Sequence, residues 1–159
     1  MRSGMGKRQR ELLRKIRALR ARDWLELLEA QLLLVRAQLI VFTRPRGGLI
    51  DGELPESGDA PTRLPASDVA QRLGVAVSRA ARFGLFRPKC LVRSLALQRM
   101  IERHGIEGSR IRIGVRRDGE QGERLTAHAW VEYGDLVLGD HDDHVATFTR
   151  LADVRMKSS

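Results

Sequence analysis

Apolar and polar residues alternate with a helical period in the first part of the chain. Between residues 25 and 42, apolar side chains recur at spacings of three and four, at Leu25, Leu28, Leu32, Val35, Leu39 and Phe42. Five further apolar residues widen this stripe, namely Leu27, Leu33, Leu34, Ile40 and Val41. So broad an apolar surface must be buried by the rest of the domain, a partner or lipid. Packing within the same domain is the commonest outcome.

Two further helices are predicted between residues 67 and 104. Ser67 is a suitable N-cap for a helix that extends to about Arg82. One side of that helix is apolar, with Val69, Leu73, Ala76 and Ala80. The Gly- and Pro-containing segment 83–88 ends it. The next helix begins near Cys90 and extends to His104, where Gly105 is placed to cap it.

After Gly105 the pattern changes to the period of two that is typical of strands. Residues 110–115 and 125–133 alternate between apolar and polar side chains. A turn at Gly134 and Asp135 leads to a third strand over residues 136–139, and residues 145–148 are a candidate fourth strand. Because helices precede a small antiparallel sheet, the predicted fold class is α+β.

Composition divides the chain into three parts. Residues 43–65 hold four of the five prolines and are predicted to be a linker without regular structure. The linker separates a basic arm and the broad apolar helix, in residues 1–42, from the remaining helices and strands, in residues 66–159. The net charge of +9 is concentrated at the N-terminus, because residues 1–22 carry nine basic groups and one acidic group.

The basic arm suits an anionic membrane surface, an acidic partner or nucleic acid, and it equally suits a solvated helix start. A single cysteine excludes an internal disulfide. The apolar helix is interrupted by charged and amide side chains, so it is not expected to span a membrane. We therefore expect a cytoplasmic protein, with peripheral contact at the membrane as one role for the arm.

Three residues of the C-terminal half form a candidate catalytic site. Cys90 follows Pro88 at the start of a helix, where the dipole and free N–H groups favour a thiolate. His128 lies on the polar side of an otherwise apolar strand, which would hold a general base rigidly. Asp140 ends the next strand and can orient the imidazole. Taken singly, a buried free cysteine and a half-exposed strand histidine remain the simpler interpretations.

The hairpin register complicates the role of Asp140. A two-residue turn at Gly134 pairs Tyr133 with Leu136, which places His141 opposite His128 and turns Asp140 to the other face of the sheet. We expect either a bulge at Gly139 or a three-residue loop to correct this.

The acidic and histidine residues at positions 140–144 also invite a metal interpretation, with His128 as a candidate further ligand. Five adjacent residues in an extended chain cannot all converge on one ion, and the sequence holds no HExxH or CxxC pattern. We therefore expect a polar turn and neither a metal ion nor a cofactor. His104 is interpreted as a helix C-terminal residue that interacts with the dipole.

Three sequence segments together resemble a known family. They are Cys90 to Met100, Arg112 to Arg116, and the segment Ala127-His128-Ala129-Trp130-Val131-Glu132. The chain resembles the leader peptidases of lasso-peptide biosynthesis, which are transglutaminase-like proteins. The resemblance implies a papain-like Cys-His-Asp triad on a transglutaminase-type fold, carried by Cys90, His128 and Asp140. The family often has Trp where Phe86 stands here.

The resemblance also implies a substrate and partners. The substrate would be a lasso precursor peptide, cut between leader and core, so that an ATP-dependent macrolactam synthetase can cyclise the core. A separate winged-helix leader-recognition protein would deliver it, because the N-terminal region leaves no room for such a domain. A small substrate pocket is expected near Trp130 or Phe86. The apolar helix and the basic arm are candidate docking surfaces for a protein or membrane, and no nucleic-acid partner is expected.

Two alternatives remain at this point. A transglutaminase-like acyltransferase would use the same three residues and pass the thioester to an amine. A non-enzymatic adaptor would use the basic arm and the apolar helix for binding, and it predicts that Cys90 is buried and unreactive.

Overall fold

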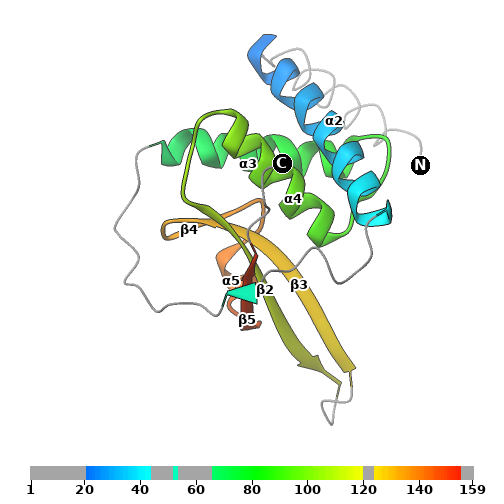
Figure 1. Cartoon of the computed structure of the whole chain (residues 1–159), viewed down its shortest axis with the longest axis vertical. Helices are drawn as coiled ribbons and strands as arrows, with labels where there is room; N and C mark the ends of the chain where they lie inside the picture. The colour runs from blue at the N-terminus through cyan, green and yellow to red at the C-terminus, as the bar shows by residue number, and fades with distance from the viewer. Residues whose placement is uncertain (1–20, 44–51, 54–65, 120–123, 155–159) are drawn as a thin grey trace, which may run out of the picture.

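The computed structural model describes residues 21–43, 52–53, 66–119 and 124–154. Within these ranges the three long helices precede strands β2 to β5 of an antiparallel sheet, so the α+β prediction is confirmed (Figure 1). The elements in chain order are α2 (Ala21–Thr43), β1 (Gly52–Glu53), α3 (Ser67–Phe83), α4 (Cys90–Arg103), β2 (Ser109–Asp118), β3 (Arg124–Tyr133), β4 (Leu136–Leu138), α5 (Asp142–Val145) and β5 (Thr149–Val154).

The sheet has the strand order β1-β5-β2-β3-β4, and all four strand pairs are antiparallel. Strands β2 and β3 form a long hairpin whose ladder runs from Ser109 opposite Tyr133 to Asp118 opposite Arg124. The turn into β4 has two residues and pairs Tyr133 with Leu136, as the sequence predicted. Strand β4 pairs for only three residues, so β3 continues past its end.

Two predictions about the strands are wrong. Residues 145–148 do not form a strand, because α5 occupies Asp142–Val145 and the next strand begins at Thr149. Val145 and Phe148 are three residues apart, so the turn after His141 carries both onto the same side, where they bury against Trp130. The predicted linker 43–65 contains a two-residue strand, β1, which pairs with β5.

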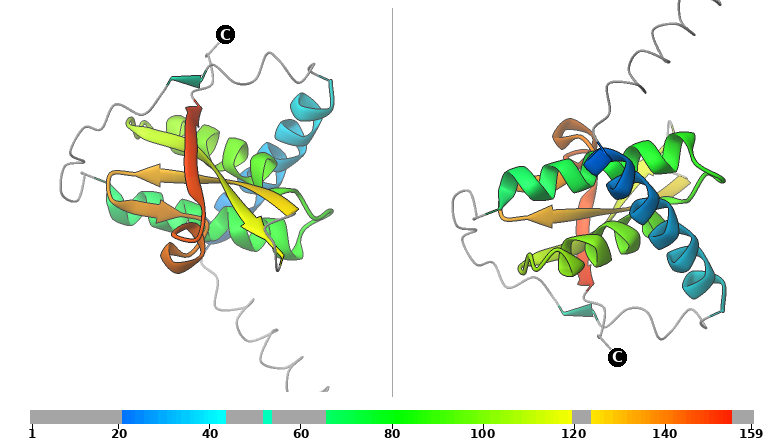
Figure 2. Two further views of the ribbon diagram at one scale, coloured as in Figure 1. Left: turned by 90° about the horizontal axis from the view of Figure 1, so that it is seen from below. Right: turned by 90° about the horizontal axis from the view of Figure 1, so that it is seen from above.

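The three long helices lie on one face of the sheet (Figure 2). The main core joins them to that face, and its fully buried members include Leu34, Leu73, Met100, Ile111 and Val131. Across the sheet, a small second cluster consists of Trp130, Val145 and Phe148, with Val137 packed against it. Strand β3 contributes alternate residues to both clusters, so it is the structural centre of the domain.

Helix α2 buries a different face from the one that the apolar stripe predicted. Its buried residues are Glu26, Ala30, Leu33, Leu34 and Ala37. Two alanines allow α2 to approach α3 and α4 closely, and Glu26 forms ion pairs with Arg72 at 3.0 Å and Arg22 at 3.1 Å. The stripe itself is exposed over most of its length, at Trp24, Leu25, Leu28, Leu32, Leu39 and Phe42. Its predicted burial against the same domain is therefore wrong.

The other two long helices end close to the predicted positions, but the predicted N-cap of α3 is wrong. Ala66, not Ser67, is the N-cap of α3; it has a left-handed conformation at φ 70° and makes no side-chain capping bond. Helix α4 ends with His104 as its C-cap, and Gly105 follows at φ 71°, a backbone angle that suits glycine. His104 also contacts Glu29 of α2 at 3.2 Å, which ties α4 to α2. Among the described helices, none is both long and apolar enough to cross a lipid bilayer.

Candidate active site

Cys90 is the first residue of α4. Lys89 before it is extended, and the first hydrogen bond of the helix runs from the Arg93 N–H to the Lys89 carbonyl at 3.1 Å. The N–H groups of Cys90 and Leu91 therefore precede the helical ladder and leave the positive end of the helix dipole at the thiol. The side chain is partly exposed, and this position matches the sequence prediction.

The environment of Cys90 favours the thiolate. The pKa of the thiol is lowered, first by hydrogen bonding with His128, while partial burial acts in the opposite direction. The backbone N–H groups of Ala129 and Leu91 lower it further. A cysteine so placed differs from the inert buried cysteine that was the simpler interpretation.

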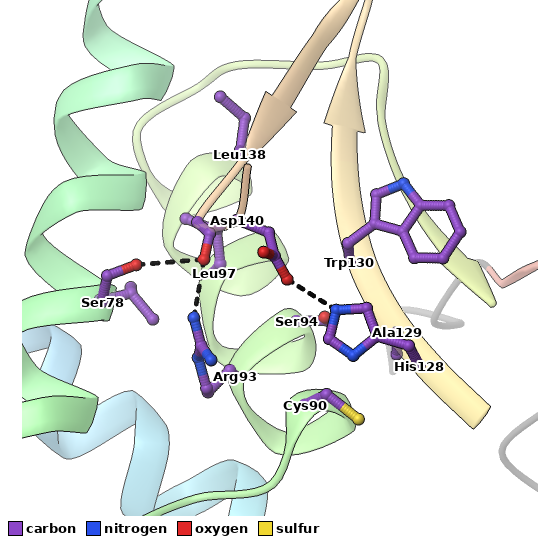
Figure 3. A pocket seen from close by; sticks show the side chains of 12 residues that line it. Ser78, Cys90, Arg93, Ser94, Leu97, His128, Ala129, Trp130, Leu138 and Asp140 are labelled. Carbon is purple, nitrogen blue, oxygen red and sulfur yellow. Dashed lines mark hydrogen bonds and ion pairs between the residues drawn. The ribbon is translucent and has the colours of Figure 1, made fainter. Parts of the chain in front are cut away.

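His128 stands between the cysteine and the carboxylate. Its Nε2 lies 2.6 Å from Oδ2 of Asp140, and its other ring nitrogen points toward Cys90 (Figure 3). The pKa of the imidazole is raised, first by the hydrogen bond with Cys90 and then by Asp140, against an opposing effect of burial. The two ring nitrogens thus have separate partners, which is the arrangement that a general base needs.

Aromatic rings fix the plane of His128. Trp130 stacks on it at a centroid distance of 6.0 Å, Phe148 lies at 5.1 Å, and His144 approaches edge-on at 4.8 Å. Gly114, opposite His128 on β2, makes room for this packing, because a Cβ there would lie 2.9 Å from both Trp130 and Phe148. The indole N–H of Trp130 donates to Glu132 at 2.8 Å, which holds that ring in place.

Asp140 faces His128 because the strand before it stops early. The β3–β4 ladder ends at Leu138, and Gly139 adopts φ 75°, a left-handed conformation that turns the next residue away from the regular alternation. The register has no shift within β4 and the turn has two residues, so the prediction of a three-residue loop is wrong. The left-handed Gly139 therefore turns Asp140 toward His128 at the end of the strand.

The carbonyl of Gly139 is held from the helical layer. Arg93 of α4 donates to it at 2.7 Å and Ser78 of α3 at 3.3 Å, as Figure 3 shows. Gly74 of α3 packs against the same segment, where a Cβ would lie 3.1 Å from the Gly139 nitrogen. Arg93 lies three residues after Cys90 and so on the same side of α4, a spacing from which its role could have been inferred.

His144 is a further neighbour of the carboxylate; the sequence placed it in a candidate metal cluster but did not predict its contact with Asp140. Its Nδ1 lies 3.0 Å from Oδ1 of Asp140, and the N–H of His141 donates to the same oxygen at 2.8 Å. Burial raises the pKa of Asp140, but these hydrogen bonds and that of His128 outweigh it, and the pKa is lowered. The signal for His144 was its spacing of four from Asp140, which brings two side chains together once α5 is recognised as helical.

The remaining candidate residues have different positions. Trp130 is only 2% exposed and lines the pocket between the helices and the strand end, whereas Phe86 packs on the main core and is not among the residues that line this pocket. The space enclosed there is about 10 Å³, close to the volume that one water molecule needs. His141 is exposed and contributes its backbone N–H, not its ring.

Comparison with known families agrees with this geometry. The family model described as "Transglutaminase-like superfamily" matches residues 31–153, which include Cys90, His128 and Asp140. The chain belongs to the transglutaminase-like superfamily, whose members are generally enzymes of the cysteine type. Searches of curated proteins and of solved structures gave no significant match.

Proposed function

We propose that this chain is a cysteine peptidase that removes the leader from a lasso-peptide precursor. The observation that carries the proposal is the order of the three groups: Cys90 at a helix start, His128 beside it, and Asp140 2.6 Å from the far nitrogen of the imidazole. The resemblance of the three sequence segments to lasso leader peptidases supplies the substrate class.

The mechanism follows from the two sides of His128. Its Nδ1 takes the proton of Cys90, and the thiolate attacks the carbonyl carbon of the scissile peptide bond. The negatively charged oxygen that forms is held by the Cys90 N–H at the helix start and by a second donor. The imidazolium, stabilised by Asp140, then gives its proton to the departing amine. Water, activated by the same imidazole, hydrolyses the thioester and releases the leader.

The delivery of the substrate is also part of the proposal. We assign the exposed stripe of α2 to docking of a separate winged-helix leader-recognition protein, because such a protein can cover an apolar ridge that the domain leaves open. The amine that the cleavage exposes on the core would then be the substrate of an ATP-dependent macrolactam synthetase. An anionic membrane is the alternative occupant of the stripe, with the basic arm as its electrostatic contact.

Cleavage of the precursor peptide, with and without the leader-recognition protein, tests the proposal. Mass spectrometry should find separate leader and core products with the wild-type chain and none with Cys90→Ala, whose folding circular dichroism would check. Full cleavage by Cys90→Ala would contradict the assignment of the nucleophile.

Replacing Leu28 and Leu32 by Glu should slow cleavage of the delivered precursor and leave cleavage of a short peptide unchanged. If the Glu variant still cleaves the delivered precursor at the wild-type rate but no longer binds anionic vesicles, the stripe of α2 would instead contact a membrane.

The acyltransferase alternative uses the same site, and the superfamily match is compatible with either reaction. A labelled primary amine in the assay separates the two reactions, since transfer would attach the label to the new carboxyl end of the leader.

The adaptor alternative predicts an unreactive, buried cysteine, whereas Cys90 is partly exposed and the pKa of its thiol is lowered. Rapid alkylation by iodoacetamide at neutral pH would count further against the adaptor.

A further inference from the structure

Three potential metal ligands meet at the outer side of the candidate active site. They are one nitrogen each of His128 and His144 and a carboxylate oxygen of Asp140, and these atoms all lie within 4.8 Å of one another. The sequence argument against a metal assumed that residues 140–144 are extended. Helix α5 removes that assumption, because it folds His144 back onto Asp140.

We propose that His128, Asp140 and His144 bind a zinc ion reversibly, and that the ion switches off the cysteine site. Two imidazoles and one carboxylate, with a fourth position open to water, are a ligand set that suits zinc, with bonds of about 2.0–2.1 Å. The proposal of inhibition rests on the proposed function, whereas the proposal of binding does not.

The geometry allows the three ligands to close around an ion. Asp140 already lies 2.6 Å from His128 Nε2 and 3.0 Å from His144 Nδ1, so the carboxylate is central. The side chain of His144 is 44% exposed and can rotate toward the ion at little cost, whereas His128 is held by its ring neighbours. Asp142 and Asp143 add negative charge in the same turn.

Binding at this point would change the proton on the catalytic imidazole. Zinc would occupy the Nε2 lone pair, and the proton that Nε2 shares with Asp140 would leave to solvent. A neutral imidazole then carries its one proton on Nδ1, the nitrogen that faces Cys90, and so cannot accept the thiol proton. Zinc would therefore inhibit without any bond to sulfur.

The histidines of the same turn provide a matched pair of variants. His144→Phe keeps an aromatic ring beside Phe148 but removes the ligand atom, whereas His141→Phe changes an exposed ring that lies outside the cluster. Both are made in the Cys90→Ala background for binding measurements. This choice removes the thiol as a competing ligand and makes the result independent of peptidase activity.

Isothermal titration with Zn²⁺ and the visible spectrum of bound Co²⁺ test the site. We expect one ion per chain, a four-coordinate Co²⁺ spectrum, at least tenfold weaker binding in His144→Phe and unchanged binding in His141→Phe. Equal losses in the two variants, or no binding to Cys90→Ala, would overturn the proposal. A sulfur-to-cobalt charge-transfer band in the wild-type chain would overturn it as well, because Cys90 would then be a ligand.

Inhibition has its own measurement. Zn²⁺ should stop precursor cleavage by the wild-type chain, a chelator should restore it, and Mg²⁺ should have no effect, because it prefers oxygen ligands. Relative to its own metal-free rate, His144→Phe should need at least tenfold more Zn²⁺. If metal binds as expected and no cleavage occurs under any condition, the proposed function fails and the metal site stands. Unchanged cleavage with zinc bound would contradict the switch.

Discussion

Arg93 donates a 2.7 Å hydrogen bond to the carbonyl of Gly139. The helix that begins with Cys90 therefore also fixes the residue immediately before Asp140. The bond thus links Cys90 and Asp140, two members of the candidate triad that are fifty positions apart in the sequence, through the backbone next to each. Ser78 of α3 donates a second bond to the same carbonyl.

Removing the Arg93 contact should loosen Asp140. Arg93→Met keeps much of the side-chain volume but leaves the Gly139 carbonyl with Ser78 as its remaining donor. Loss of this partly buried hydrogen bond costs about 1–3 kcal/mol of stability. Because Asp140 would also lose its orientation, kcat should fall while KM changes little, and Arg93→Lys should recover part of the rate. Steady-state kinetics and thermal unfolding check this, and an unchanged kcat in Arg93→Met would contradict the role of the contact.

The left-handed conformation of Gly139 should be required for activity as well as for folding. Gly139→Ala places a Cβ 3.2 Å from Leu97 Cδ2, in addition to the backbone penalty of about 1–2 kcal/mol for φ 75°. Gly105→Ala is the matched control, since it has φ 71° and open space around a Cβ. Both variants should lose stability in thermal melts, but only Gly139→Ala should lose cleavage at a temperature where both are folded. Equal activity would mean that Asp140 does not depend on Gly139.

The pH dependence of cleavage should be bell-shaped. The thiolate of Cys90 forms as pH rises through its lowered pKa, and the imidazolium of His128 is lost as pH rises through its raised pKa. The pair of Cys90 thiolate and His128 imidazolium is therefore populated between two apparent pKa values, which belong to the pair as a whole and not to either residue. In Asp140→Asn the alkaline limb should move to lower pH, because a group that raises the pKa of His128 is gone. The rate should also fall, by up to about 10⁴-fold in a comparable triad.

A pH–rate profile of wild type and Asp140→Asn measures both effects. His141→Gln serves as the control, since only the backbone N–H of that residue contacts Asp140. A shift of the alkaline limb in the control, or none in Asp140→Asn, would argue that His128 is oriented by another group.

The two sides of α2 should respond differently to truncation. Leu34 is fully buried, so Leu34→Ala should cost about 2–5 kcal/mol of stability. Leu32 is 63% exposed, and Leu32→Ala should change stability by no more than about 0.5 kcal/mol. Chemical denaturation of the two variants gives the comparison. A large loss from Leu32→Ala would show that the stripe is covered within the chain itself.

The local elements and the chemistry at their ends could be predicted from the sequence alone. Helical spacing and the Pro88 break place Cys90 at a helix start, Gly105 marks the end of that helix, and the two-residue turn at Gly134 sets the β3–β4 register. These features are local, because each depends on residues within a few positions of one another. The broad apolar pattern of α2 also predicted a helix correctly.

Which faces and side chains meet depends on tertiary packing. Which side of α2 is buried depends on the close approach that Ala30 and Ala37 allow and on the ion pairs of Glu26, and no periodicity encodes those contacts. Asp140 faces His128 because Arg93 and Ser78 hold the carbonyl of a left-handed Gly139. His144 joins the site because α5 and the turn that follows it pack Val145 and Phe148 against Trp130. Such contacts join residues far apart in the sequence, and their energies arise only in the packed domain.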